Sequence, residues 1–293
     1  MDAKIIIGYD VEHDDDDALL LATQLGRLIG AAIEVVAVLP WPQHLANADD
    51  LQREVDAELD ERFATIQERL DDFEVATRGV AHHSPAEVLS AVAEDADATL
   101  IVIGSSHRGP VGRTLLGGVG ESLAHGAACA IAVAPHGYGA TEEGEFARIA
   151  VAYDGSDEAA VALQTAAAFA ERAEGELTVL TVADYPRYTR AAAWSLVTEG
   201  EIHDREHAER QGLVDEAVAG VGEAVPAAGR VLTGDPAREL AAASSDFDLI
   251  VAGSRSYGPL RRTLLGSATR RLLAESQCPV LVLPRGTEPL LSN

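Results

Sequence analysis

The chain contains one sequence pattern twice, and this duplication restricts its fold more than any other feature. Residues 104–118 read GSSHRGPVGRTLLGG and residues 253–267 read GSRSYGPLRRTLLGS, and the two 34-residue windows that begin there share 14 identities. Gly104, Gly117 and Cys129 each recur 149 positions later. A unit repeated once over 293 residues predicts two similar domains in tandem.

Within each copy, apolar runs alternate with amphipathic segments. The runs predict five strands per copy, in the first copy at residues 5–9, 33–39, 73–80, 99–104 and 130–135. Helical periodicity predicts helices between them, at residues 18–29, 48–70, 85–94 and 117–126. Strands that are apolar on both faces and alternate with helices are typical of a parallel sheet between two helix layers. The predicted fold class is α/β, with two tandem, doubly wound domains of five mainly parallel strands each.

The domains are expected at residues 1–138 and 146–293, with a linker at 139–145. The stretch HGYGATEEGEF (136–146) is rich in glycine and glutamate and has no apolar periodicity, which is typical of a connecting segment.

The charge excludes several classes of partner. The formal net charge is −26, from 48 acidic and 22 basic residues, and Lys4 is the only lysine. Such a surface repels nucleic acid and anionic lipid over a screening length of about 10 Å at 0.1 M salt. The sequence has no long apolar run and no signal-peptide pattern at its start, so we expect no membrane association and a cytoplasmic location.

The repeated glycine stretches lie where a doubly wound fold binds ligands. Ligands bind beyond the carboxyl ends of the strands, at the point where the strand order reverses. Asp10 and Asp154 follow the first strand of each copy, and the glycine stretches follow the fourth. Each stretch leads into a helix whose first backbone N–H groups attract an anion such as phosphate. The P-loop pattern GxxxxGK[ST] is absent, so we expect a different kind of phosphate site.

Over nearly the whole chain, this order of elements resembles the universal stress protein family. The resemblance rests on YDGS (153–156), GDPA (234–237), CPVLVLP (278–284) and the two glycine stretches. It implies Rossmann-like domains that pair through their last strands, here AIAVAP and PVLVLP. It also implies that the chain binds ATP or a related nucleotide, with or without a bound Mg²⁺ ion, and that the glycine signature surrounds the phosphates.

The resemblance carries over to the second copy almost intact. The matching positions are Asp154 near adenine and ribose, Val182 at the adenine, and the signature residues Gly253, Ser256, Gly266 and Ser267. Ser256 stands where the family has its second signature glycine.

The first copy departs further from the family pattern. Its matching positions are Asp10, Val38, Gly104, His107, Gly117 and Gly118. His107 replaces the second glycine, and Gly118 replaces the serine or threonine at the helix start. We therefore expect binding mainly in the second domain.

Two functions stay open at this point. The first is a stress-response regulator that binds ATP or a related nucleotide, with at most slow hydrolysis because no catalytic base is evident. The alternative is a dimeric scaffold with vestigial sites and no nucleotide, working through domain pairing, homo-oligomers or surface contacts.

Other polar groups are expected to be structural. His203 and His207 have a zinc-compatible i, i+4 spacing but no third ligand in sequence, so no metal site is predicted. His82, His83 and Ser84 follow the third strand without forming a recognisable catalytic set. The run Asp14–Asp17 is expected to be a solvated first helical turn. Cys129 and Cys278 are expected to be small buried hydrophobic residues.

Overall fold

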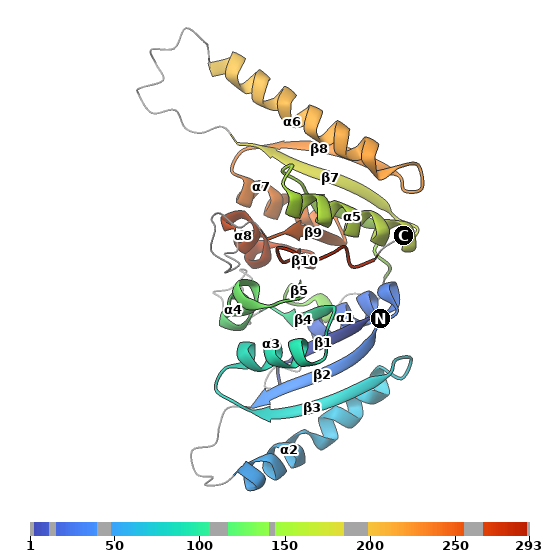
Figure 1. Cartoon of the computed structure of the whole chain (residues 1–293), viewed down its shortest axis with the longest axis vertical. Helices are drawn as coiled ribbons and strands as arrows, with labels where there is room; N and C mark the ends of the chain where they lie inside the picture. Colours follow the sequence, from blue (N-terminus) through green and yellow to red (C-terminus); the bar gives the residue numbers. More distant parts are fainter. Residues whose placement is uncertain are drawn as a thin grey trace.

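The computed structural model describes residues 3–11, 16–39, 48–105, 117–140, 144–184, 199–254 and 266–291, and its two halves share one ten-stranded sheet (Figure 1). The first half contributes β1 (Lys4–Tyr9), β2 (Ala32–Leu39), β3 (Val75–Ala81), β4 (Leu100–Gly104) and β5 (Ala130–Ala134). The second half contributes β6 (Arg148–Ala152), β7 (Glu176–Ala183), β8 (Ala227–Thr233), β9 (Leu249–Gly253) and β10 (Val280–Leu283). The strand order is β3-β2-β1-β4-β5-β10-β9-β6-β7-β8.

Each half is the doubly wound domain that the sequence predicts. All strand pairs within a half are parallel. The chain builds outward from β1 to β3 and then crosses back to β4, which lies on the other side of β1. The strand order therefore reverses between β1 and β4, and between β6 and β9 in the second half.

The two halves meet through their last strands, as expected. β10 pairs with β5 in antiparallel register, Ala132 lies opposite Leu281, and these two residues hold the same position in the two copies. The pseudo-two-fold axis therefore passes between Ala132 and Leu281. Pairing these strands leaves neither one as an open edge of the sheet.

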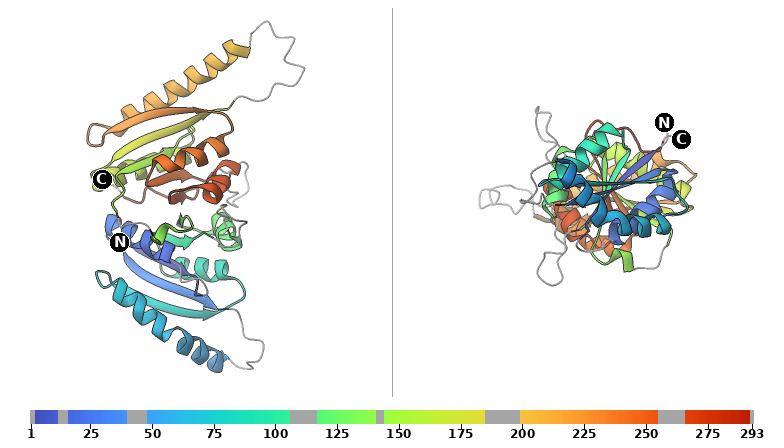
Figure 2. Two further views of the ribbon diagram at one scale, coloured as in Figure 1. Left: turned by 180° about the vertical axis from the view of Figure 1, so that it is seen from behind. Right: turned by 90° about the horizontal axis from the view of Figure 1, so that it is seen from below.

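Helices cover both faces of this sheet (Figure 2). One core lies under α1 (Asp16–Ile29), α2 (Ala48–Arg69), α5 (Asp157–Arg172) and α6 (Glu199–Val221). The other lies under α3 (Pro85–Asp95), α4 (Gly118–Gly126), α7 (Pro236–Ala243) and α8 (Ser267–Glu275). None of the helices in the described ranges is long and apolar enough to cross a bilayer.

Asp17 corrects the expectation of a solvated acidic turn at the start of α1. Its side chain is buried and accepts hydrogen bonds from the backbone N of Gly137 (2.9 Å) and of Gly139 (2.6 Å). Gly139 belongs to the short 3-10 helix η1 (Tyr138–Ala140), which follows β5 and packs on α1. The carboxylate thus joins the start of α1 to the turn that follows β5. Asp14 lies outside the described residues.

Glu34 is a second acidic residue that is not on an exposed helix face. It lies on β2 and is almost fully buried, between Lys4 Nζ of β1 (2.8 Å) and Arg78 Nη2 of β3 (2.9 Å). The only lysine of the chain thus compensates a buried carboxylate, because a buried charge without a partner is strongly destabilising.

The cysteines only partly follow the expectation of burial. Cys278 is buried, as predicted, and burial raises its pKa to about 12. Cys129 is only partly buried, and desolvation raises its pKa to about 11. Both thiols therefore stay neutral at physiological pH.

Candidate functional site

The candidate site of the second domain lies where β6 and β9 end side by side. Ala152 pairs with Ala252 in parallel register, so Asp154 and Ser254 both follow the carboxyl ends of neighbouring strands. β1 and β4 are neighbours in the same way, which places Asp10 and Ser105 at the equivalent edge of the first domain. The first and fourth strands of each copy are therefore adjacent.

A local turn holds the carboxylate of Asp154 in place. Its Oδ1 accepts hydrogen bonds from Ser156 N (3.0 Å) and Ser156 Oγ (2.6 Å). Ser156 is also the N-cap of α5, because its Oγ accepts from Ala159 N (3.2 Å). The sequence YDGS therefore fixes both the start of α5 and the orientation of the partly buried Asp154.

The start of α8 presents backbone donors without a side-chain cap. Gly266 is the N-cap and supplies no side chain, and the exposed Ser267 is the first helical residue. Thr269 Oγ1 lies 3.4 Å from the carbonyl oxygen of Gly253, which joins the first turn of α8 to the end of β9. The first N–H groups of an α-helix have no partner within the helix, and with the partial positive charge of the helix start they suit an anion.

Gly253 is a glycine because a helix packs against it. A Cβ atom at this position would lie 2.8 Å from the backbone C and O atoms of Glu158 in the first turn of α5. The absent side chain therefore allows α5 to approach β9 closely, and the fold itself accounts for this residue.

Two serine hydroxyls in the paired sites lack a hydrogen-bond partner. Ser254 Oγ and Ser105 Oγ are buried, and neither has a partner among the described residues. The two residues are 149 positions apart and each follows the last residue of its strand. A buried hydroxyl without a partner is costly and therefore marks a place where a ligand or water can bind. Sequence reasoning missed both residues, although their equal spacing within the duplication was visible.

The position that the family resemblance assigns to the adenine also differs between the copies. Val182 is 9% exposed near the end of β7, opposite Leu232 of β8. Val38 occupies the equivalent place on β2 and is partly exposed. Asp10 is exposed, in contrast to the partly buried Asp154.

The helix start of the first domain differs chemically from that of the second. Gly117 is the N-cap of α4 without a side-chain hydrogen bond, and Gly118 is the first helical residue where α8 has Ser267. Gly104 ends β4 as Gly253 ends β9. His107 and Ser256 lie outside the described residues.

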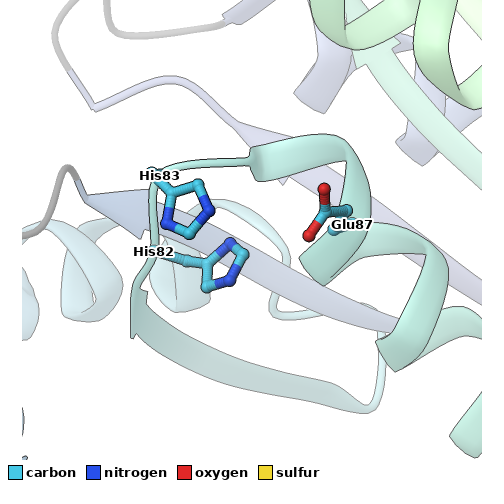
Figure 3. Close-up of side chains that lie close together, drawn as sticks. All are labelled: His82, His83 and Glu87. Atoms are coloured by element: carbon cyan, nitrogen blue, oxygen red, sulfur yellow. The ribbon is translucent and has the colours of Figure 1, made fainter.

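One cluster of potential ligands among the described residues contains histidines, and it does not include the pair His203 and His207. Of the described residues, the only group of three potential metal ligands with mutually close donor atoms is His82, His83 and Glu87 (Figure 3). His203 and His207 lie on α6 and do not belong to it. Sequence reasoning considered the two histidines of the loop but missed Glu87, which the spacing Ser-x-x-Glu identifies as a first-turn residue.

Comparison with known proteins gives consistent results. A sequence profile described as "Universal stress protein family" matches residues 1–135 and 145–284. The universal stress protein Rv2319c of Mycobacterium tuberculosis is 26% identical over 290 residues, which is 96% of this chain and 99% of that protein. Rv2005c of the same organism is 32% identical over 193 residues, 64% of this chain, and the match spans 62% of its length, less than two thirds.

A solved structure agrees over the full length. The chain resembles the crystal structure of a universal stress protein from Archaeoglobus fulgidus with a TM-score of 0.67, covering 97% of this chain and 96% of that one. At 19% identity this likeness concerns the fold alone.

Proposed function

The chain belongs to the universal stress protein family, a family of stress-response proteins, and on this basis we propose that its second domain binds ATP or a related nucleotide as a regulatory module. The observation that carries the proposal is the buried, unpartnered hydroxyl of Ser254 beside the uncapped start of α8. A nucleotide offers oxygen atoms to both groups, which have no partner among the described residues.

Each part of the nucleotide has a candidate partner in this domain. The first amides of α8, Gly266 and Ser267 would hold the phosphates, with Ser256 in the same signature loop. Asp154 is already oriented by Ser156 and would bind the ribose or adenine as an acceptor. Val182, at the end of β7, would border the adenine. A Mg²⁺ ion bound with the phosphates would reduce their repulsion from this acidic chain.

The proposed role is binding and regulation. The Asp154 carboxylate already accepts two hydrogen bonds from Ser156 on Oδ1, an arrangement that suits binding more than the activation of water. We therefore assign at most slow hydrolysis of ATP. Nucleotide binding would act by changing the shape or the partners of the chain, in the cytoplasm as the sequence suggests.

A scaffold without nucleotide is the second candidate, and the first domain favours it. Gly118 there removes the hydroxyl that Ser267 offers, and Asp10 is exposed. The central β5–β10 pair involves no residue of either candidate site.

Paired substitutions test the proposal. Replacing Gly266 by Asp places a carboxylate at the start of α8, where it repels phosphate, and Gly117→Asp makes the same change at α4. We expect calorimetry with ATP to show loss of binding for Gly266→Asp and little change for Gly117→Asp. Equal losses from both variants contradict the assignment to the second domain, and absence of binding by the unchanged chain favours the scaffold. Mass spectrometry of nucleotide released from freshly purified protein identifies the base.

A further inference from the structure

The loop between β3 and α3 brings two imidazoles and a carboxylate together in the first domain. One donor atom each from His82, His83 and Glu87 lies within 4.8 Å of the others. The two rings are stacked, with centroids 4.3 Å apart and planes inclined by 23°. Figure 3 shows both rings on the loop and the Glu87 carboxylate beside them on the first turn of α3.

The backbone fixes the position of His82. Its N–H donates to the carbonyl oxygen of Leu39 (2.9 Å), which extends the ladder between β2 and β3 by one residue. Its ring Nδ1 lies 3.1 Å from Ser84 N and 3.2 Å from Ser84 O. In the metal-free structure Ser84 N–H donates to Nδ1, so metal binding through Nε2 requires the other tautomer. In that tautomer Nδ1–H donates to the Ser84 carbonyl and Nε2 keeps the lone pair, and backbone carbonyls commonly support ligating histidines in this way.

The same contacts leave the carboxylate of Glu87 available. Ser84 caps α3, because its Oγ lies 3.4 Å from Glu87 N. In a complete capping box the Glu87 side chain would accept from Ser84 N in return. Here Ser84 N faces His82 Nδ1 instead. Neither the Glu87 carboxylate nor the His83 ring has a hydrogen bond or ion pair with any described residue, and both side chains are exposed.

The second domain provides an internal comparison. It shares the Pro-Ala start of the helix, but the equivalent positions are Thr233, Gly234 and Arg238. Gly234 has no side chain to offer and adopts φ +140°, and an arginine does not ligate a cation. The described cluster is therefore a feature of the first domain alone, whose phosphate signature is also the more altered one.

We propose that His82, His83 and Glu87 bind a divalent transition-metal ion of the zinc class. Two imidazoles and one carboxylate form a three-ligand set that suits zinc and leaves a position for water. Bonds of about 2.1 Å place tetrahedral ligands about 3.4 Å apart. The donor atoms of the three residues lie up to 4.8 Å apart, so they must move closer to bind one ion. The exposed side chains of His83 and Glu87 can rotate to do this at little cost. The net charge of −26 also attracts cations to the surface.

The test uses the full chain, purified without a histidine tag and treated with a chelator. We expect calorimetry with Zn²⁺ to show one ion per chain, and Co²⁺ to give the visible absorption of a four- or five-coordinate complex. The main variant combines His83→Gln with Glu87→Gln, both at exposed positions that the fold does not need. It should weaken Zn²⁺ binding at least about tenfold, because it leaves one ligand of three. His82→Gln alone should also weaken it.

The matched control combines His203→Gln with His207→Gln on α6, the other histidine pair with ligand spacing. It should leave the affinity and the Co²⁺ spectrum unchanged. The proposal is overturned if the unchanged chain fails to bind Zn²⁺, or if the α6 variant and not the loop variant loses binding. Circular dichroism of each variant separates lost ligands from lost folding.

Discussion

Arg270 Nη1 of α8 lies 3.4 Å from Glu121 Oε1 of α4, and the two residues hold the same position in the two copies of the repeat. In a symmetric pair of identical domains, this position would face its own copy, and two like charges would meet. The duplication has allowed the two copies to acquire opposite charges. The contact therefore favours pairing of the two halves within one chain.

Reversing one of these charges should produce a small, salt-sensitive destabilisation. Both side chains are about half exposed, so we expect Arg270→Glu to lower the free energy of unfolding by at most about 1 kcal/mol at low salt. Adding Glu121→Arg should restore the loss. A double-mutant cycle by denaturant unfolding measures the coupling, and a coupling energy of zero in dilute salt argues against a role for this pair.

The side chains of Ala132 and Leu281, on the pseudo-two-fold axis, should be complementary in volume. Ala132 and Leu281 pair directly and both are fully buried. Leu281→Ala should cost about 2–5 kcal/mol because it leaves a cavity. Ala132→Leu should cost about 1–3 kcal/mol through overpacking. The exchanged double variant should cost less than the sum of the two changes in thermal or denaturant unfolding. Simple additivity would mean that the two side chains do not share one space.

The unpartnered serines should respond differently to ligand. Ser254→Ala removes a buried hydroxyl that has no partner in the described part of the chain, so the nucleotide-free protein should gain up to about 1 kcal/mol of stability. The same change should weaken ATP binding roughly tenfold if the hydroxyl contacts the ligand. Ser105→Ala should bring the gain in stability without the loss of affinity. Calorimetry combined with unfolding checks both, and an unchanged affinity of Ser254→Ala removes this hydroxyl from the site.

The two thiols should be protected in the folded protein. Burial raises the pKa of Cys278 from 9.0 to about 12 and that of Cys129 from 9.0 to about 11. At pH 8 we expect slow alkylation by iodoacetamide, with Cys129 ahead of Cys278, and fast alkylation in denaturant. The folded state holds the two thiol protons more tightly than the unfolded state does. The contribution of the protonated thiols to the free energy of unfolding is therefore complete below pH 9 and is lost as the pH rises toward 12. Equal rates for native and unfolded protein would show that the thiols are accessible.

Salt should stabilise the chain. With 48 acidic and 22 basic residues, repulsion opposes compaction, and sodium chloride shortens the screening length from about 10 Å at 0.1 M to about 3 Å at 1 M. The exposed ion pairs that salt weakens contribute at most about 1 kcal/mol each. We expect the Tm to rise over this range, and ATP affinity with it. A flat or falling Tm would indicate that local pairing outweighs the repulsion.

Much of the fold follows from the sequence, because its signals are local and repeated. Apolar runs and helical periodicity predict the described strands and helices of the first copy to within a few residues, and the duplication indicates the equivalence of the halves. Asp154 and Gly253 could be assigned to one edge of the sheet because parallel strands bring their carboxyl ends together. The pairing of the last strands is expected from the family resemblance, and it satisfies backbone groups that an edge strand would expose.

Only the tertiary structure decided which polar side chains are buried and what they contact. The sequence predicts that Asp17 is one of four acidic residues in a solvated turn. In the structure its carboxylate accepts hydrogen bonds from Gly137 and Gly139, about 120 residues later in the chain. Glu34 becomes buried between two neighbouring strands, and Glu87 comes to face the His82–His83 pair only when α3 starts beside the loop. Sequence periodicity reports which face of an element is apolar. The neighbours of a polar group depend on how distant segments pack, and a single sequence carries no local signal for that.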